Sequence, residues 1–212
     1  MGTISKGILG GFSGTVGTVV GGSWKGISYM RSRSAGRTNA PSQAQLEQQA
    51  KFAVGMKFVQ PLAGLLSLSF KSFADKMSGI NNAFSYALKN AVTGSFPNYS
   101  IDYSLVLVSR GDLPNGANPA ASAIADSIVT FTWTDNTKTG KAKTNDRALL
   151  VVYCPALNQV VYTTGSAARG SGTDTLAVST FTGRRVETFI GFISQDGKDV
   201  SNSIYTGGLT IS

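Results

Sequence analysis

The feature that most constrains the fold is a series of short apolar segments, separated by turn residues, in the C-terminal half of the chain. Seven such segments occupy 101–109, 127–134, 147–154, 158–164, 174–180, 185–194 and 200–206. Asp196-Gly197 lies between two of them and is typical of a β-hairpin. About seven short strands at this spacing predict an antiparallel β-sandwich of the immunoglobulin or fibronectin-III type.

Three residues of this half bear on its core and its surface. Cys154 ends an apolar run and is the chain's single cysteine, so we expect a small buried hydrophobe rather than a disulfide. Trp133 and Tyr162 are the aromatic residues that an adhesion or carbohydrate-binding module would use on such a sandwich. Core positions are the favoured interpretation for both.

Residues 41–94 carry helical signals. Ser42 and Gln45 form a capping-box pattern, and Pro61 predicts the end of this first helix at about Gln60. Two further helices are indicated by apolar residues at helical spacing, the last of them ended by Gly94. Their apolar stripes are Leu62, Leu65, Leu66, Ser69, Phe70 and Phe73, then Ile80, Ala83, Phe84, Ala87, Leu88 and Ala91. We expect core faces, with a groove-docking or interfacial helix as the alternative.

The first 40 residues are rich in glycine, with ten glycines among the first 36 residues. Residues 15–20 are mostly β-branched, and Gly21-Gly22 predicts the two-residue turn of a hairpin. A hairpin of this size has no core, so it must lie on its own domain or on a neighbouring subunit, where its open edges can pair with another chain. The predicted fold class is therefore α+β: a basic glycine-rich β-hairpin arm (1–40), a helical region (41–98) and a β-sandwich (99–212).

A membrane or export role is not expected for the glycine-rich segment. The uncharged stretch 7–24 has a marginal length for a membrane span, and its six or more glycines each cost a helix about 1 kcal/mol relative to alanine. The apolar core and the cleavage site of a signal peptide are missing. We expect the protein in the cytoplasm or in an assembled particle.

The excess of positive charge is confined to one half of the chain. Residues 1–100 carry ten Lys and Arg against two acids, whereas residues 101–212 carry nine of each, so the net charge of +8 lies in the first half. This asymmetry indicates an anionic partner, which could be nucleic acid, an acidic membrane face or an acidic patch on another subunit. A generally basic, soluble surface is the alternative.

The candidate contact residues are the basic and aromatic side chains that alternate in the glycine-rich segment: Trp24, Lys25, Tyr29, Arg31, Arg33 and Arg37. Cations on an extended segment can follow phosphates, and aromatic rings can stack on bases. Arg31 and Arg33 alternate with serines, so a strand would place both on one face. The same residues suit a contact between subunits.

The chain contains no histidine and one cysteine, which excludes histidine-based catalytic triads and most zinc sites. The glycines at 11, 14 and 17 do not have nucleotide-binding spacing, and Thr139-Gly140-Lys141-Ala142 is not a phosphate loop. We predict no catalytic residue, no cofactor and no metal site. An incidental Ca²⁺ site beside Asp135 and Asp146, or beside Asp196 and Asp199, is the alternative.

Several motifs run the length of the chain. They are Gly7–Gly14, Val16–Gly21, Trp24-Lys25-Gly26, Met30-Arg31, Gln45-Leu46, Lys51-Phe52, Leu88–Gly94, Ile101–Tyr103, Ser109–Leu113, Phe131–Trp133 and Ser194–Gly197. In these motifs the chain resembles a family of bacterial proteins of about this length that is known only as a domain of unknown function. The resemblance implies one natural unit and no particular activity, cofactor or catalytic residue.

Three functions are consistent with these observations. The first is a non-enzymatic, self-assembling structural protein, such as a virion, filament or sheath subunit, whose N-terminal arm contacts a second copy. The second is nucleic-acid binding through the basic half, which predicts a steep dependence on salt. The third is an adhesion or carbohydrate-binding module, which the fold alone does not support.

Overall fold

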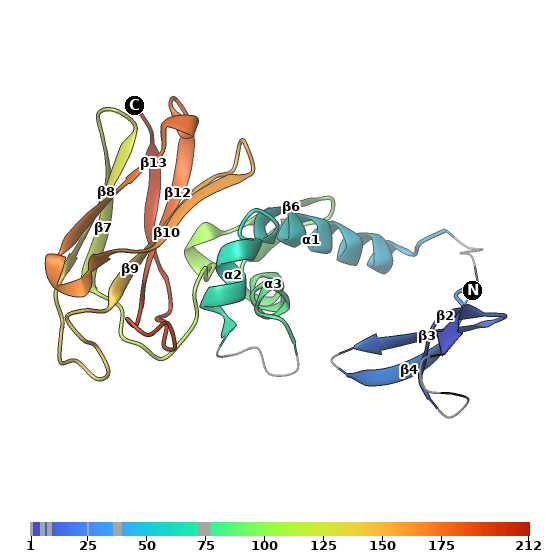
Figure 1. Ribbon diagram of the computed structural model, residues 1–212. Coiled ribbons are helices and arrows are strands. Elements are labelled where there is room, and N and C mark those ends of the chain that lie inside the picture. The colour runs from blue at the N-terminus through green and yellow to red at the C-terminus, as the bar shows by residue number, and fades with distance from the viewer. Residues whose placement is uncertain (1, 5–6, 8–9, 25, 36–39, 72–76) are drawn as a thin grey trace. The chain divides into compact units, whose positions relative to one another are not determined.

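The computed structural model describes residues 2–4, 7, 10–24, 26–35, 40–71 and 77–212 (Figure 1). The chain divides into two compact units, Met1–Ser42 and Gln43–Ser212. Each unit is described by itself below.

The N-terminal unit is an antiparallel sheet with the strand order β1-β2-β3-β4. Its strands are β1 (Thr3–Ile4), β2 (Phe12–Val16), β3 (Val19–Trp24) and β4 (Ile27–Ser32). The turns fall at Gly17 and Gly26, whose φ angles of 57° and 82° are available to glycine without strain. The predicted hairpin turn at Gly21-Gly22 is therefore wrong, because these two glycines lie inside β3.

The C-terminal half of the larger unit consists of two antiparallel sheets, with orders β10-β9-β12-β13 and β11-β8-β7. The strands are β7 (Ala117–Ile124), β8 (Ile128–Thr134), β9 (Arg147–Cys154), β10 (Gln159–Ala168), β11 (Thr173–Ala177), β12 (Arg185–Ile193) and β13 (Ile204–Thr210). Phe131, Trp133, Leu150 and Phe192 belong to the buried cluster that the two sheets share. The predicted antiparallel β-sandwich is confirmed.

The helical region precedes the sandwich. It comprises α1 (Gln43–Val59), α2 (Ala63–Ser69), α3 (Gly79–Asn90) and the hairpin β5 (Val92–Ser95) and β6 (Asn98–Ile101). As predicted, α1 begins directly after Ser42 and ends before Pro61. At the start of α3, the Ser78 hydroxyl accepts a hydrogen bond from the Asn81 amide at 3.2 Å, a typical N-cap. Phe73 lies outside the described residues.

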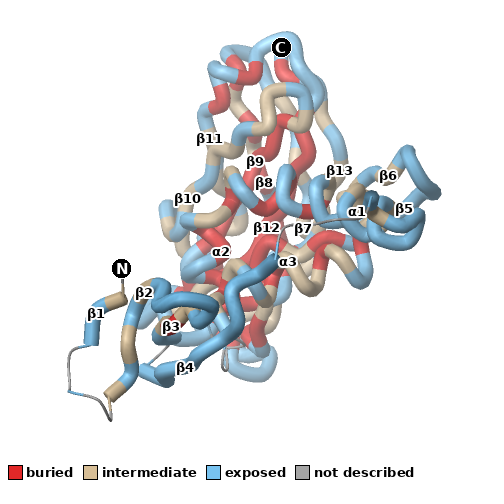
Figure 2. Tube along the Cα trace, turned by 90° about the vertical axis from the view of Figure 1, so that its right-hand side faces the viewer, coloured by how far each residue is buried: buried red, intermediate tan, exposed pale blue. Residues whose placement is uncertain are grey.

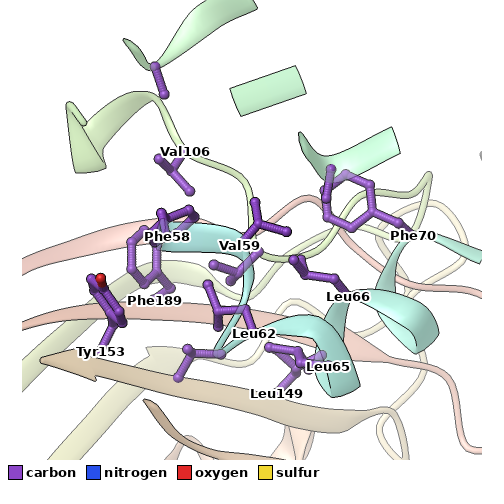
Figure 3. Close-up of a cluster of buried hydrophobic side chains, with 14 residues drawn as sticks. Phe58, Val59, Leu62, Leu65, Leu66, Phe70, Val106, Leu149, Tyr153 and Phe189 are labelled. Carbon is purple, nitrogen blue, oxygen red and sulfur yellow. The ribbon is translucent and has the colours of Figure 1, made fainter. Parts of the chain in front are cut away.

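The helices cover the outer face of the four-stranded sheet. Leu62, Leu65 and Leu66 belong to the same buried cluster as Leu149 of β9 and Phe189 of β12 (Figure 3). The apolar stripe of the second predicted helix is therefore a core face over its described residues. On α3, Ala83 and Ala87 are buried, so this stripe too is a core face.

Strand β9 is buried on both faces. Leu149, Val151 and Tyr153 join the cluster beneath the helices, whereas Leu150 and Val152 join the cluster inside the sandwich. Successive side chains of a strand point to opposite faces, so one strand contributes to two cores. Its continuous apolar sequence is the signature of a strand covered on both sides.

Two strand predictions need correction. The segment predicted as a strand over 101–109 forms a 3-10 turn at Tyr103–Leu105 and then a loop. The last strand begins at Ile204 rather than at 200. The backbone there pairs with the loop instead, since the Ser203 amide donates to the Ser109 carbonyl at 3.0 Å and the Ser109 hydroxyl donates to the Ser201 carbonyl at 2.9 Å.

Single residues of the sandwich also test the predictions. Cys154 is a free, fully buried thiol and Trp133 is buried, both as predicted. Tyr162 is 38% exposed, so its predicted core position is wrong; it lies on β10, an edge strand of its sheet. Over the described residues, no single helix is long and apolar enough to cross a membrane. Helices α1 and α2 have the required length and composition only when taken together, and this pair is bent by 84°.

Candidate functional site

The N-terminal sheet presents aromatic and basic side chains on one of its faces. Trp24 pairs with Ile27 across β3 and β4, Gly22 pairs with Tyr29, and Val20 pairs with Arg31. Residues directly opposite each other share a face, and alternate residues along a strand share it too. Val20, Trp24, Ile27, Tyr29 and Arg31 therefore lie on one side of the sheet, here called the aromatic face.

The opposite side of the sheet is apolar as well. Ile4 pairs with Phe12, Val16 pairs with Val19, and Met30 pairs with Gly21. By the same alternation, Ile4, Phe12, Val16, Val19 and Met30 form the second side, here called the aliphatic face.

The dipeptide Gly21-Gly22 gives room to a ring on each face. A Cβ atom on Gly21 would lie 2.3 Å from the Phe12 carbonyl oxygen and 2.6 Å from its ring, on the aliphatic face. A Cβ atom on Gly22 would lie 2.9 Å from the Tyr29 ring, on the aromatic face. Glycine in a strand interior often marks such a close approach, and here it explains two adjacent glycines without a turn.

Neither face is covered within the unit. Trp24 is 58% exposed, Ile27 72% and Met30 71%. Gly21 is the one buried residue among those of Met1–Ser42 that the structure describes, and Figure 2 shows these strands mostly in the exposed colour, with some intermediate positions. Apolar side chains are thus exposed on both sides of a small sheet that has no core of its own, which makes this sheet the candidate interaction surface.

The predicted contact residues are placed in part. Trp24, Tyr29 and Arg31 share the aromatic face. Arg33 follows β4, and its amide donates to the Thr18 carbonyl at 2.7 Å, so the pairing continues one residue beyond the strand. Lys25 and Arg37 lie outside the described residues. Sequence reasoning missed Ile27 and Met30, although their apolar side chains beside arginines were a visible signal.

Asp146 takes part in a buried ion pair rather than lining an open loop. Its Oδ2 atom accepts from Arg169 Nε at 3.2 Å and from the Lys143 amide at 2.8 Å. The Arg169 side chain is fully buried, donates to Asn136 Oδ1 and to the Pro114 carbonyl, and lies 4.2 Å from the centre of the Phe192 ring. Desolvation lowers the Arg169 pKa and Asp146 opposes this shift. The pair joins loops at one end of the sandwich.

The carboxylates of Asp135 and Asp196, also considered for calcium, are bonded within their own turns. Asp135 Oδ1 accepts from the hydroxyl and amide of Thr137, and these bonds lower the Asp135 pKa. Asp196 Oδ1 accepts from Ser194 at 2.6 Å and from the Lys198 amide at 3.2 Å, which lowers its pKa in the same way. Within the described ranges, no three His, Cys, Asp or Glu side chains gather in a way that could hold a metal ion.

A second buried carboxylate lies on the sheet beneath the helices. Glu187 of β12 accepts from Arg185 Nε at 3.1 Å and from the Tyr205 hydroxyl. Burial and this carboxylate raise the Tyr205 pKa to about 12. Burial also raises the pKa of Tyr103, with Glu187 as the secondary cause.

Of the two aromatic residues considered for sugar recognition, only Tyr162 is exposed. Trp133 is 5% exposed, and its indole N–H donates to the Arg169 carbonyl at 2.7 Å, so its ring is not available for stacking. A hollow of about 280 Å³ at the end of the sandwich is lined by polar or small residues, among them Asn145, Arg147 and Gln195. It has no aromatic wall.

Comparison with known proteins decides the family. The model of a family of unknown function, DUF6266, matches residues 11–207. The chain belongs to the DUF6266 family. The match begins just before β2 and ends within β13, so it covers β2, β3 and β4 of the N-terminal sheet as well as the helical region and most of the sandwich.

Other comparisons add little to the DUF6266 assignment. No curated protein matches the chain. Among solved structures, the chain is similar to the fn3 domain of the human collagen alpha-1(XX) chain, with 14% identity and a TM-score of 0.33 over 46% of this chain and 85% of that one. The function therefore has to be argued from the surfaces of this DUF6266 protein.

Proposed function

We propose that this protein is a non-enzymatic, self-assembling structural subunit whose N-terminal sheet docks on a second copy of the chain. The observation that carries the proposal is the exposure of apolar side chains on both faces of a sheet without a core. Three large apolar side chains are exposed on the aromatic face and four on the aliphatic face, which favours a covered state at roughly 25 cal/mol for each Å² removed from water.

Charge supports the choice of a second copy as the partner. Residues 1–42 carry five Lys and Arg and no acid, whereas Gln43–Ser212 carry all eleven acids of the chain together with fourteen Lys and Arg. The larger unit thus supplies the opposite charges that such a sheet needs at the rim of an interface. The outer strand β4 also leaves one backbone edge open for pairing with another strand.

Removal of the N-terminal segment tests the proposal. Full-length protein should form oligomers or larger particles by light scattering and electron microscopy, and protein lacking residues 1–40 should remain a folded monomer. In the full-length chain, Met30→Asp and Ile27→Asp place a charge on the aliphatic and aromatic faces, and each should reduce assembly at least tenfold because it buries an unpaired charge.

A matched control separates this effect from a general loss of surface hydrophobicity. Ile124 is also exposed but lies on β7 of the sandwich, so Ile124→Asp should leave assembly unchanged. Normal assembly of the protein lacking residues 1–40 would refute the proposal.

Nucleic-acid binding is the second candidate, favoured by one observation. Arg31 shares the aromatic face with Trp24 and Tyr29, so a cation and two rings are directed to the same side. Rings contribute about 1–3 kcal/mol per stacked base, and cations contribute a salt-dependent attraction to phosphates.

Fluorescence anisotropy with a labelled single-stranded oligonucleotide tests this candidate. Binding should weaken steeply between 50 and 200 mM salt, on the order of tenfold or more. Tyr29→Ala should weaken it by roughly tenfold, while Lys57→Gln on α1 should have little effect. A response that does not change with salt would exclude this function.

A further inference from the structure

The small hollow at the end of the sandwich, of about 280 Å³, has the chemistry of a binding site. It is lined by Asn145, Arg147, Gly165, Ser166, Ala167, Ala168 and Gln195. Its volume lies just below the roughly 300–1,000 Å³ of pockets for drug-sized molecules, so a ligand here must be small. The lining holds one cation and no acid, and its largest apolar side chain is alanine, so the ligand must also be polar.

Arg147 provides the positive charge of this hollow. Its side chain is exposed, and no carboxylate within the described residues lies at ion-pair distance from it. Its Nη1 donates to the Gly165 carbonyl at 3.4 Å, a long hydrogen bond, which leaves most of its N–H donors for a ligand. A guanidinium without a counter-charge can bind a carboxylate through two parallel hydrogen bonds.

A bulge in β10 makes room for this arginine. The pairing of β10 with β9 shifts register between Thr164 and Ala168, and Gly165 within the bulge has a φ angle of 131°. A Cβ atom on Gly165 would lie 2.8 Å from Arg147 Cδ, so glycine leaves space for the arginine side chain. Bulges redirect side chains and are frequent beside functional sites.

The two walls of the hollow are joined by the buried ion pair described above. Asp146 lies between Asn145 and Arg147 on one wall, and Arg169 directly follows Ala168 on the other. Besides the ion pair, the Arg169 amide donates to the Asp146 carbonyl at 2.7 Å. A lining that is fixed by buried contacts is preorganised for its ligand.

The uncharged polar groups of the lining favour hydroxyls. Asn145 Nδ2 donates to Gln195 Oε1, which leaves the Asn145 oxygen as an acceptor and the Gln195 nitrogen as a donor. The Ser166 hydroxyl donates to Asp174 Oδ2, a carboxylate that does not itself line the hollow. Because this carboxylate repels an anion, a negative group is directed to Arg147 and neutral hydroxyls are directed to the Ser166 side.

We propose that this hollow binds a sugar acid, that is, a small ring with one carboxylate and several hydroxyls. The carboxylate pairs with Arg147, and the hydroxyls, which both donate and accept, bond to the two carboxamides and to the Ser166 oxygen. One cation in the lining matches one carboxylate, whereas a phosphate group with nearly two charges would remain unbalanced. This site belongs to the larger unit alone, goes beyond the proposed assembly function and does not depend on it.

Saturation-transfer NMR with galacturonate tests the site on the full-length protein. The method observes the ligand, so it works on monomers and on assembled particles. Galactose lacks the carboxylate, acetate lacks the hydroxyls, and galactosamine carries the opposite charge. Galacturonate should give a saturable signal, and each of these comparisons should bind more weakly, by roughly tenfold or more.

A galacturonate oligomer distinguishes two sources of the same chemistry. Tighter binding of the oligomer than of the single sugar would support the proposal with an acidic polysaccharide as the source. Equal binding would support it with a free sugar acid as the source.

Substitutions on the arginine separate charge from geometry. Arg147 is exposed, so its replacement leaves the fold intact. Arg147→Gln should weaken galacturonate by roughly tenfold or more, whereas Arg147→Lys keeps the charge, loses the paired hydrogen bonds and should weaken it less. Gly165→Ala should also weaken binding, because the added methyl meets the Arg147 side chain. Arg184→Gln, which removes an exposed arginine outside the hollow, is the matched control and should have no effect.

Three results would overturn this proposal. They are the absence of a saturable signal with galacturonate, binding of galactose as tight as that of galacturonate, and an unchanged affinity in Arg147→Gln. None of these measurements depends on whether the protein assembles, so their outcome is independent of the assembly test.

Discussion

The two units of the chain use β-structure in opposite ways. In Gln43–Ser212, the sheet that contains β9 is covered on one face by helices and on the other by a second sheet, and both faces are closely packed. In the N-terminal unit, a sheet of similar strand number is covered on neither face. The larger unit therefore buries its own apolar side chains. The smaller unit has apolar side chains too, but it has no second layer that covers them.

This difference separates residues that stabilise the fold from residues that are candidates for recognition. A buried apolar side chain in the larger unit contributes to its free energy of unfolding. An exposed one in the N-terminal sheet contributes nothing until another surface covers it. The following predictions test this separation, beginning with the largest effect.

Removal of the buried arginine should affect the larger unit most. Arg169→Met leaves Asp146 buried without its counter-charge, which typically costs about 3–5 kcal/mol. For a unit of this size that corresponds to a fall in melting temperature of about 10 °C. Differential scanning calorimetry measures both quantities.

Two further variants identify the cause. Arg184→Met removes an exposed arginine and should change stability by less than about 0.5 kcal/mol. The double variant Arg169→Met with Asp146→Asn should be less destabilised than Arg169→Met alone, because no buried charge then remains. Equal losses in the single and double variants would show that packing, not charge, dominates.

Truncation on either face of β9 should be costly. Leu149→Ala and Leu150→Ala remove neighbouring side chains that enter different cores, and each should destabilise by about 2–5 kcal/mol. Urea unfolding measures the change. A small loss for Leu149→Ala with a large loss for Leu150→Ala would show that the helical layer contributes little to the stability of this unit.

Loss of the Tyr205 hydroxyl should have a moderate effect. Tyr205→Phe leaves one Glu187 oxygen without its hydrogen bond, which costs about 1–3 kcal/mol at a buried site. Chemical denaturation at pH 7 measures the loss.

The same residue makes stability depend on alkaline pH. A pKa of about 12 in the folded protein, against 10.0 for an ordinary tyrosine, means that the folded state holds the phenolic proton more tightly. Its contribution is complete below pH 10 and declines as the pH rises from about 10 to 12. Tyr205→Phe should therefore reduce the slope of stability against pH in this window, and an unchanged slope would contradict the assignment.

The smallest effect on overall stability should come from the paired glycines of β3. Gly21→Ala meets a backbone carbonyl, whereas Gly22→Ala meets only the movable end of the Tyr29 ring. Gly21→Ala should therefore disrupt the N-terminal sheet and Gly22→Ala should be tolerated, both within about 0.5 kcal/mol for the larger unit. Hydrogen exchange of the β3 amides distinguishes the two variants. Equal protection in both would contradict the explanation that these glycines make room for the Phe12 and Tyr29 rings.

Local sequence signals were sufficient to predict the bounds of those helices and strands that are fixed by nearby residues. Ser42 and Pro61 delimit α1, and the continuous apolar run 147–154 is β9 with the predicted bounds. By contrast, β7 consists largely of alanine and serine, which have low strand propensity. It forms because it pairs with β8, a contact between segments that no local pattern reveals.

The candidate surface could be predicted by residue type but not by geometry. Trp24, Tyr29 and Arg31 were indicated by their alternation, yet the second apolar face around Met30 depends on strand register. The dipeptide Gly21-Gly22 is compatible with a hairpin turn and also with a strand against which two aromatic rings pack. Which of the two forms depends on the positions of Phe12 and Tyr29. Arg169 was missed because its partners come from distant loops.

The double burial of β9 has a consequence for how the larger unit unfolds. A strand that belongs to two hydrophobic clusters couples them, so the helical layer and the sandwich should lose structure in one cooperative transition. A fragment beginning at residue 99 would expose the apolar side of β9 and β12 and would aggregate. Natural or engineered truncation is then tolerated near residue 42, between the compact units, but not at the boundary between helices and sandwich.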